Sequence, residues 1–451
     1  MFEIDRRLPT PLPAQIANEL RRQVALGSLV AGDRVPSTRE LSRALGVSRG
    51  SVVAAYDQLL SEGFLKSSQG APTVVHPDLP TPAEVRPRRL QPSHHTKRTH
   101  DISLRPSSGH AETIRPAAWR RAWREAADVG PEAVDKAGQP ALRWAIAEHL
   151  RLSRGMQVDP DQVIVTGGSR EGLLLILMSL GRGLRVGVEN PGHPGLRRVI
   201  ALSGHACVEC ATDAQGMVPK DLPADLDAVL VTPAHLFPLG KAMPAARRSA
   251  LSTWARDTNT VIIEDDYNAE LRYRYSPHPP LAVSANQSPV LTLGTFSTLL
   301  STQLSAGYVL ADPDYAAALH SARAVLGMPV SPVTQYAIAS LLDAGQARRN
   351  SRTVHKRLLQ RRKVIADTLM PAFQAAGATV DDGGETISTD LAVRFAAPEK
   401  LSAFRRQLDC AGLGYGTFDE SRALHLSFAH LGDGDFAAAV ELLVAKLRTS
   451  R

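Results

Sequence analysis

The chain has 451 residues, 43% of them hydrophobic and 22% charged, which is the balance of a globular protein and excludes the disordered and fibrous classes. Its three cysteines exclude a disulfide-stapled secreted scaffold and fit a reducing compartment. The first residues, MFEIDRRLPT, hold no apolar signal core, and the longest apolar stretch, residues 172–180, is too short to cross a bilayer. We therefore expect a soluble cytoplasmic protein without a membrane partner.

Positive charge is concentrated toward the N-terminal end. Residues 1–100 hold fourteen Arg or Lys against nine Asp or Glu, and so carry about five of the seven net positive charges. A basic end joined to a nearly neutral body favours a polyanion-binding module attached to a second unit. Charge alone leaves nucleic acid and simple solubilisation both open.

Residues 1–75 begin with a helix-turn-helix pattern. Apolar residues recur at helical spacing over residues 16–29, and residues 37–40, Ser-Thr-Arg-Glu, have the form of a capping box that opens a second helix. Gly46 makes a short turn, and Ser48 caps a third helix. Two short helices across a tight turn that contains Gly are typical of this motif.

A wing and a linker follow. Residues 64–66 and 73–75 predict two short strands around a tip at Gln69 and Gly70. Residues 76–105 are rich in proline and arginine, which predicts an extended, semi-rigid linker. Contact with DNA phosphates and a solvated tether both remain open for this stretch.

The rest of the chain predicts two further domains. Residues 106–335 alternate between strand and helix, which predicts an α/β domain with a mostly parallel sheet. Residues 336–451 hold a long basic helix over 347–368 and short strands, which predicts a smaller α+β domain. The strands expected in the two domains are 163–166, 184–188, 228–231, 261–265, 290–295, 307–310, 390–395 and 424–428.

A Cys-x-x-Cys pair raises the question of a metal site. Cys207 and Cys210 lie near His205, but on a predicted strand, where residues three apart point to opposite faces. Neither a second such pair nor a matching His pair follows. We therefore expect no metal site.

The first unit resembles the winged helix-turn-helix of the GntR superfamily over the run GDRVPSTRELSRALGVSRGSVVAAYDQLLSEGFL. A Ser-Arg pair at the start of the recognition helix points a guanidinium and helix N-terminal amides at the groove. The wing, SSQGAPT, lacks the basic, Gly-rich character usual in that superfamily. The resemblance implies DNA contacts at Arg39, Ser48, Arg49, Gly50, Ser51, Gln69 and Gly70.

The body resembles a type I aminotransferase, and a GntR-like head fused to that fold is the arrangement of the MocR/GabR regulators. The matching stretches include DPDQVIVTGGSREGL, VIIEDDYNAELRY and LGTFSTLLSTQLSAGYVL. The resemblance implies a winged helix-turn-helix followed by aminotransferase fold type I, with a large domain built on a mostly parallel sheet and a smaller α+β domain.

The sequence departs from this family where the cofactor would bind. The family holds pyridoxal phosphate through an imine to the lysine of G-T-F-S-K, and Thr298 occupies that position here. Ser305 replaces a phosphate-binding Arg, His193 the ring-stacking Tyr, and His425 the carboxylate-binding Arg. A hydroxyl forms no imine, so we expect no covalent cofactor.

Other cofactor residues of the family are kept. The resemblance implies that Asp265 and Tyr267 face the pyridine ring, although they could also simply hold the end of the sheet. It places Ser169, Arg170 and Ser297 in the phosphate cup. Lys241 is the alternative amine near the cleft, but its position matches a family residue without a cofactor role.

We therefore expect a dimeric regulator that binds a double-stranded DNA operator and is not an enzyme. Its body would sense a small-molecule effector without transamination, in a cleft that favours a ligand less anionic than pyridoxal phosphate. Residual non-covalent pyridoxal phosphate binding stays open. The two cleft histidines predict pH-dependent binding around neutrality. The alternatives are an active pyridoxal phosphate-dependent aminotransferase with an accessory domain and a body that only dimerises.

Overall fold

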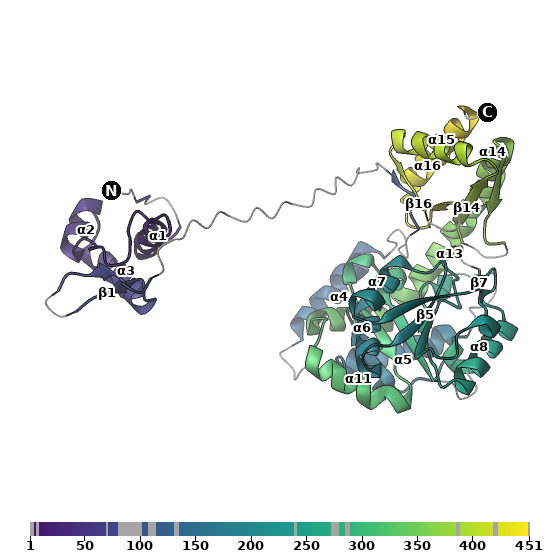
Figure 1. Ribbon diagram of the computed structural model, residues 1–451, viewed down its shortest axis with the longest axis horizontal. Coiled ribbons are helices and arrows are strands. Elements are labelled where there is room, and N and C mark those ends of the chain that lie inside the picture. The colour runs from purple at the N-terminus through teal and green to yellow at the C-terminus, as the bar shows by residue number, and fades with distance from the viewer. Residues whose placement is uncertain are drawn as a thin grey trace. The chain divides into compact units, whose positions relative to one another are not determined.

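The computed structural model describes residues 4–5, 9–68, 71–79, 102–106, 114–129, 135–238, 241–271, 279–284, 289–384, 388–417 and 423–449. The chain divides into two compact units, residues 1–97 and 98–451. Figure 1 shows the elements of both units.

The first unit is a three-helix bundle with a two-stranded wing. Ser37 caps the second helix, and the side chain of Glu40 bonds back to the Ser37 amide at 2.8 Å, so the predicted capping box is present. Gly46 ends that helix in the left-handed conformation, with φ of 64°. The elements are α1 (Leu12–Ala25), α2 (Thr38–Leu45), α3 (Arg49–Ser61), β1 (Leu65–Lys66) and β2 (Val74–Val75).

One face of α3 packs into the core of this unit. Val52, Ala55 and Leu59 are fully buried there together with Ile16 of α1. The strands β1 and β2 are antiparallel, as a wing requires. The predicted wing tip, Gln69 and Gly70, lies outside the described residues.

The second unit is built on a seven-stranded sheet of order β4-β12-β11-β10-β9-β5-β6. The strand β12 runs in the opposite direction to the other six strands of this sheet, which all run in the same direction. The prediction of a mostly parallel sheet is therefore confirmed. The strands are β4 (Val163–Thr166), β5 (Arg185–Glu189), β6 (Ala206–Cys210), β9 (Ala228–Val231), β10 (Val261–Asp265), β11 (Val290–Thr295) and β12 (Gly307–Leu310).

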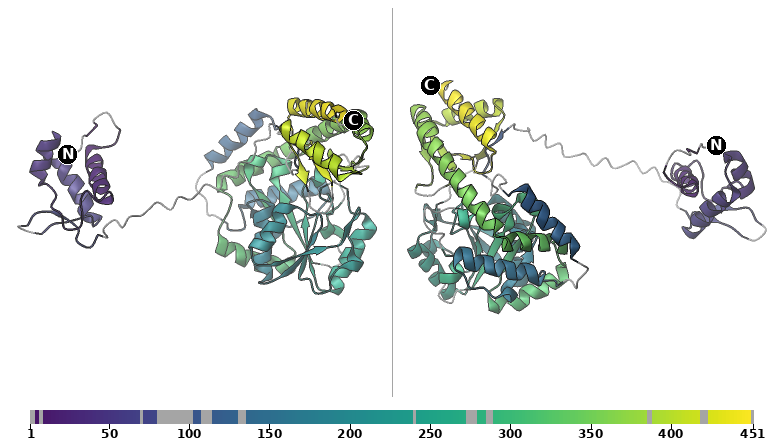
Figure 2. Two further views of the ribbon diagram at one scale, coloured as in Figure 1. Left: turned by 45° about the horizontal axis from the view of Figure 1, so that its top comes forward. Right: turned by 180° about the vertical axis from the view of Figure 1, so that it is seen from behind.

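Helices cover both faces of this sheet, as the two views in Figure 2 show. Alternate strand residues take opposite faces: Ile164 belongs to a core cluster that also contains residues of α6, α7 and α11, whereas Val163 and Val165 belong to one that contains residues of α5 and α12. Toward the other edge, α8 covers the second face over Val229 and neighbouring strands. These helices are α4 (Pro116–Asp128), α5 (Pro140–Arg154), α6 (Ser169–Leu180), α7 (Pro194–Leu202), α8 (Ala245–Asp257), α9 (Leu281–Ser284), α10 (Phe296–Leu299), α11 (Pro313–Leu326) and α12 (Pro332–Asp343).

The long helix α13 leads from this domain into a smaller one, as the long green helix in the right-hand view of Figure 2 shows. The small domain packs helices on an antiparallel sheet of order β13-β14-β17-β16. Its elements are α13 (Gln346–Val364), η5 (Ile365–Leu369), α14 (Met370–Ala375), β13 (Ala378–Asp381), β14 (Asp390–Phe395), α15 (Pro398–Cys410), β15 (Leu413–Gly414), β16 (Gly416–Thr417), β17 (Leu424–Ser427) and α16 (Asp433–Thr449).

Part of the predicted linker belongs to this small domain. The strand β3 (Ile102–Ser103) pairs in parallel with β15. Leu104 is fully buried in the small-domain core, and its carbonyl accepts a hydrogen bond from the Ser427 amide at 2.8 Å. Residues 102–104 therefore pack as part of the second unit. The composition of residues 76–105 predicts a linker over that whole range, and these three residues depart from it.

No described helix is long and apolar enough to span a bilayer.

Candidate functional site

The residues predicted to contact DNA lie together around the start of α3. Arg39, Arg49 and Gly50 are exposed, and the Ser48 hydroxyl caps the helix by accepting a hydrogen bond from the Ser51 amide at 3.1 Å. The Arg49 Nε lies 3.4 Å from the Thr38 hydroxyl of α2. The guanidinium is therefore held at the junction of the two helices of the motif.

This end of α3 has the chemistry of an anion site. The first amides of a helix lack intrahelical partners and attract phosphate. A Cβ added at Gly50 would meet only the Ser48 hydroxyl, at 3.9 Å. The missing side chain leaves room for close approach of a nucleic-acid backbone.

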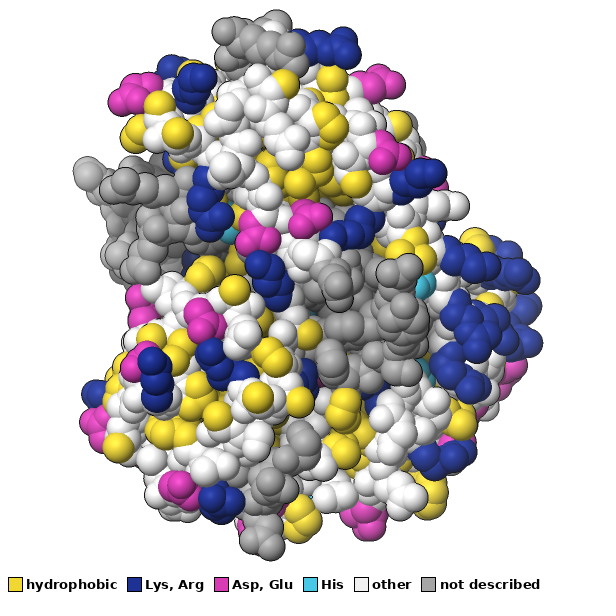
Figure 3. All heavy atoms as spheres, turned by 90° about the vertical axis from the view of Figure 1, so that its right-hand side faces the viewer, with side chains coloured by type: hydrophobic (Ala, Val, Ile, Leu, Met, Phe, Trp, Pro, Cys, Tyr) yellow, Lys and Arg dark blue, Asp and Glu magenta, His cyan; other side chains and the backbone are white. Residues whose placement is uncertain are grey.

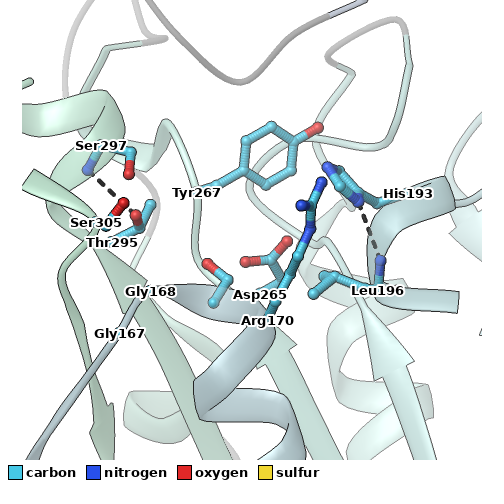
Figure 4. Close-up of a pocket in the computed structure, with 11 residues that line it drawn as sticks. Gly167, Gly168, Arg170, His193, Leu196, Asp265, Tyr267, Thr295, Ser297 and Ser305 are labelled. Carbon is cyan, nitrogen blue, oxygen red and sulfur yellow. Dashed lines mark hydrogen bonds between the residues drawn. The ribbon is translucent and has the colours of Figure 1, made fainter. Parts of the chain in front are cut away.

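A second candidate site is a cleft of about 210 Å³ at the carboxyl ends of the parallel strands, where ligands of open α/β sheets bind. Its walls come from the ends of β10 and β11, from the first turns of α6, α7 and α10, and from the short segments after β4 and β10 and before β12. Figure 4 shows how these side chains converge. The lining residues are Gly167, Gly168, Ser169, Arg170, His193, Leu196, Asp265, Tyr267, Thr295, Ser297 and Ser305.

Asp265 is the buried acid of this cleft. Only 3% of the residue is exposed, and its Oδ1 has no hydrogen-bond partner among the described residues. Burial, reinforced by the charges of Asp266 and Glu189, raises its pKa to about 7, against a hydrogen bond from Ser169 that lowers it. This carboxyl group therefore changes charge near neutral pH.

His193 is held in place by the helix that it caps. Its Nδ1 accepts hydrogen bonds from the amides of Gly195 and Leu196 at 3.1 and 3.3 Å. Burial, and to a smaller extent the charge of Arg170, lowers its pKa to about 4. The ring is therefore neutral at pH 7, with its proton on Nε2, because Nδ1 is an acceptor.

The prediction that two histidines make the cleft pH-dependent near neutrality is wrong. Burial also lowers the pKa of His425 to about 4, with a smaller contribution from Arg394. Both rings therefore stay uncharged across the neutral range. Asp265, whose titration no local sequence pattern indicates, is the described cleft residue that ionises there.

Arg170 is the exposed cation of the cleft. Its guanidinium lies directly against Gly195, since a Cβ there would meet the Arg170 nitrogens at 2.8 Å. In Figure 4 the side chain rises from α6 between Tyr267 and His193. Together with the amides at the start of α6, it can attract a negatively charged group.

Several predicted cleft residues lie outside the cavity lining. Thr298 is buried on α10, and His425 is buried on β17, in register with Ala392 and Gly416. Lys241 pairs with Asp381 of the small domain, with 3.0 Å between Nζ and Oδ2. The structure thus brings together Ser169, Arg170, His193, Asp265, Tyr267, Ser297 and Ser305, but not these three.

A second cavity of about 560 Å³ adjoins the cleft and shares Arg170 and His193 with it. It is lined further by Arg105, Phe237 and Tyr415. Sequence reasoning missed these residues because they come from three distant segments. It also missed Thr295, although the end of a predicted strand could have identified that residue.

The Cys-x-x-Cys pair forms no metal site in the described part of the chain. Cys207 and Cys210 lie on β6, the edge strand of the sheet, with Cys207 half-buried and Cys210 buried. No group of three or more His, Cys, Asp or Glu suited to a metal occurs among the described residues.

A winged helix-turn-helix joined to an aminotransferase fold defines a DNA-binding transcription regulator with an aminotransferase-like domain. Residues 107–380 match the family "Aminotransferase class I and II", and residues 12–75 match "Bacterial regulatory proteins, gntR family". The chain belongs to the aminotransferase class I and II family and, through its gntR-type head, to the regulators of the MocR type.

Named relatives and solved structures agree with this assignment. The pyridoxine biosynthesis transcriptional regulator PdxR of Corynebacterium glutamicum is 44% identical and covers 80% of this chain and 79% of its own length. The probable rhizopine catabolism regulatory protein MocR of Rhizobium meliloti is 29% identical and covers 81% of this chain and 78% of its own length. An archaeal alanine:glyoxylate aminotransferase is 20% identical, covers 77% of this chain and 91% of its own, and superposes with a TM-score of 0.68. An aminotransferase from Mycobacterium tuberculosis is 22% identical, covers 78% of this chain and 93% of its own, and superposes with a TM-score of 0.64.

The family implies pyridoxal phosphate, and the described cleft fits its covalent attachment poorly. An imine needs an amine, and no lysine lies among the described residues that line either cavity. The unpartnered oxygen of Asp265 and the cation of Arg170 would suit a polar ligand held without a covalent bond. The described lining residues therefore offer no group that could form the imine on which pyridoxal phosphate chemistry depends.

Proposed function

We propose that this regulator binds a small effector non-covalently in the Asp265 cleft, carries out no transamination, and acts as a dimer on its operator. The observation that carries the proposal is Thr298 at the position of the family lysine. Without an amine there, the group that forms and exchanges the imine is missing.

The cleft chemistry supports a ligand that carries less negative charge than pyridoxal phosphate. Ser305 stands where the family has a phosphate-binding Arg, so Arg170 is the cation that remains in the described lining of the 210 Å³ cleft. Asp265 offers an unpartnered acceptor to an N–H or O–H group of the ligand. The name of the 44% identical relative refers to pyridoxine biosynthesis, which makes the uncharged alcohol pyridoxine a suitable first probe.

Thermal unfolding of the full chain tests the effector site. A ligand that binds only the folded state stabilises it by mass action. We expect pyridoxine to raise the unfolding midpoint more than pyridoxal phosphate does, and Arg170→Ala, which removes a cleft wall, to diminish the shift. Arg182→Ala, an exposed arginine outside the cleft lining, is the matched control.

Two alternatives make different predictions in the same preparations. An active aminotransferase would exchange amino groups between an amino acid and a 2-oxo acid when pyridoxal phosphate is added, whereas we expect no exchange. A body that only dimerises would show no shift with either probe while DNA binding stays intact. Either result would replace the proposed effector-sensing function.

A further inference from the structure

The helix α13 carries a concentration of positive charge that neither candidate site uses. Of its 19 residues, eight are Arg or Lys and none is Asp or Glu. Figure 3 shows a face of the molecule on which Lys and Arg side chains gather most densely at the right-hand edge.

Three of these cations hold the small domain. Arg361 is buried and donates to the carbonyls of Phe428 and Leu431 at 2.7 and 2.8 Å. Arg362 pairs with Asp382 at 3.0 Å, and Arg357 lies 3.4 Å from a carboxyl oxygen of Asp433. These contacts give the three cations a structural role inside the chain.

Of the remaining five cations, Arg349 donates a hydrogen bond to the carbonyl of Ala344. The other four form an exposed row, the basic face: Arg348, Arg352, Lys356 and Lys363. At about 100° per residue, these positions fall within roughly 80° of the helix circumference, and the first three repeat about every 6 Å. With the described residues, none of the four side chains forms a hydrogen bond or a salt bridge. Arg348 has an acid nearby, Glu148 of α5, whose pKa is lowered mainly by its hydrogen bond to Arg151 and in small part by Arg348.

This row does not stabilise the helix that carries it. Like charges four residues apart repel each other, as in the pairs 348/352 and 352/356. Arg348 also lies near the N-terminus of α13, where the helix dipole disfavours a cation, and no acid occupies the first turn. The arrangement is therefore better explained by an external polyanion than by intramolecular stability.

We propose that the basic face of α13 binds backbone phosphates of double-stranded DNA, so that the body of the protein contacts the nucleic acid as well as the head. The proposal rests on the DNA-binding function of the head. DNA held by the head is at high effective concentration for the body because the two units share one chain. Duplex DNA presents a negative charge about every 1.7 Å of its axis, which complements a row of cations.

The test measures the salt dependence of binding by the full chain to a random-sequence duplex of about four helical turns. The variant Arg348→Gln/Arg352→Gln/Lys356→Gln removes three charges from the basic face. Each lost phosphate contact reduces the slope of log K against log salt by about 0.9, so we expect the slope to become less steep by about 2–3 units. The control Arg182→Gln/Arg198→Gln/Lys220→Gln removes three exposed charges from other elements, and it should leave the slope nearly unchanged.

Equal slopes for the wild type and the basic-face variant would overturn the proposal. Sedimentation of both proteins is the second readout, since loss of a dimer in the variant would make this face an interface between copies and would also overturn it. Arg49→Ala separates this proposal from the function of the head. If only Arg49→Ala weakens binding, the basic face is excluded, whereas if only the basic-face variant does, the contact assigned to Arg49 is excluded.

Discussion

The buried carboxyl group of Asp265 sets the electrostatics of the cleft. Its neighbours Glu189 and Glu264 are also buried acids, and burial raises their pKa values to about 7 and about 8. A ligand that donates a hydrogen bond to Asp265 would therefore meet an acceptor whose charge depends on pH in the neutral range. His193, which is neutral there, contributes a fixed donor instead.

Asp265→Asn should change how stability depends on pH. Because the folded-state pKa of about 7 lies above the unfolded value of 3.8, the wild type loses stability as the pH rises from about 4 to 7, at up to about 1.4 kcal/mol per pH unit. The variant lacks this loss, so its advantage should grow over that range and level off above it. Denaturant unfolding at several pH values measures the difference, with the exposed Asp221→Asn as control. A difference that is independent of pH would mean that Asp265 titrates normally.

Arg49→Ala tests the DNA contact of the head. If the guanidinium reads a base, operator affinity should fall by about 1–3 kcal/mol, mostly for the preferred sequence. If it holds a phosphate, the loss should be uniform across sequences, with a salt slope lower by about one unit. Fluorescence anisotropy with specific and random duplexes separates the two cases. Arg22→Ala is the control, since Arg22 pairs with Glu19 on α1, and unchanged affinity for Arg49→Ala would remove this residue from the interface.

At the level of elements, local signals were sufficient for most of the fold. The capping box at Ser37 and the cap at Ser48 each satisfy amides within three residues, so the sequence near them determines the helix start. The strand that ends at Asp265 is apolar for its first three residues, as a buried parallel strand requires. These features could be predicted without knowledge of distant contacts.

Features that depend on residues far apart in the chain could not be predicted in this way. The strand β3 forms because Ile102 meets Leu413 of β15, and no local pattern indicates that pairing. The low pKa of His193, which caps the start of α7, depends on burial and on Arg170 of α6. The resemblance grouped Thr298 and His425 with the cleft, whereas neither residue is among those that line it.

The segment from α10 to β12 provides a test of the proposed loss of covalent cofactor binding. Thr298→Lys restores the amine but not the phosphate anchor, so we expect weak imine absorbance when pyridoxal phosphate is added. The double variant Thr298→Lys/Ser305→Arg should give stronger imine absorbance. Ser305 lines the cleft, so the introduced guanidinium would supply the positive charge that anchors the phosphate. Ser305→Arg alone is the control and should form no adduct that borohydride traps. Full covalent loading of Thr298→Lys alone would contradict the importance of the anchor.

At the scale of the whole molecule, we expect a dimer. Symmetric dimers place two heads on half-sites separated by whole helical turns of DNA. Sedimentation at micromolar concentration should give the mass of two chains, both with and without operator DNA. A monomer under both conditions would contradict this expectation and would leave the half-site geometry without a basis.

The whole chain, as we propose it, is a DNA-binding regulator that has kept the aminotransferase fold without covalent pyridoxal phosphate. The most direct test is the intact mass of the full chain, purified from cells supplied with the cofactor and then treated with borohydride. We predict the mass of the unmodified chain, 48.5 kDa, in a preparation that binds DNA. A stoichiometric adduct on Lys241 or on any other lysine of the body would contradict this prediction.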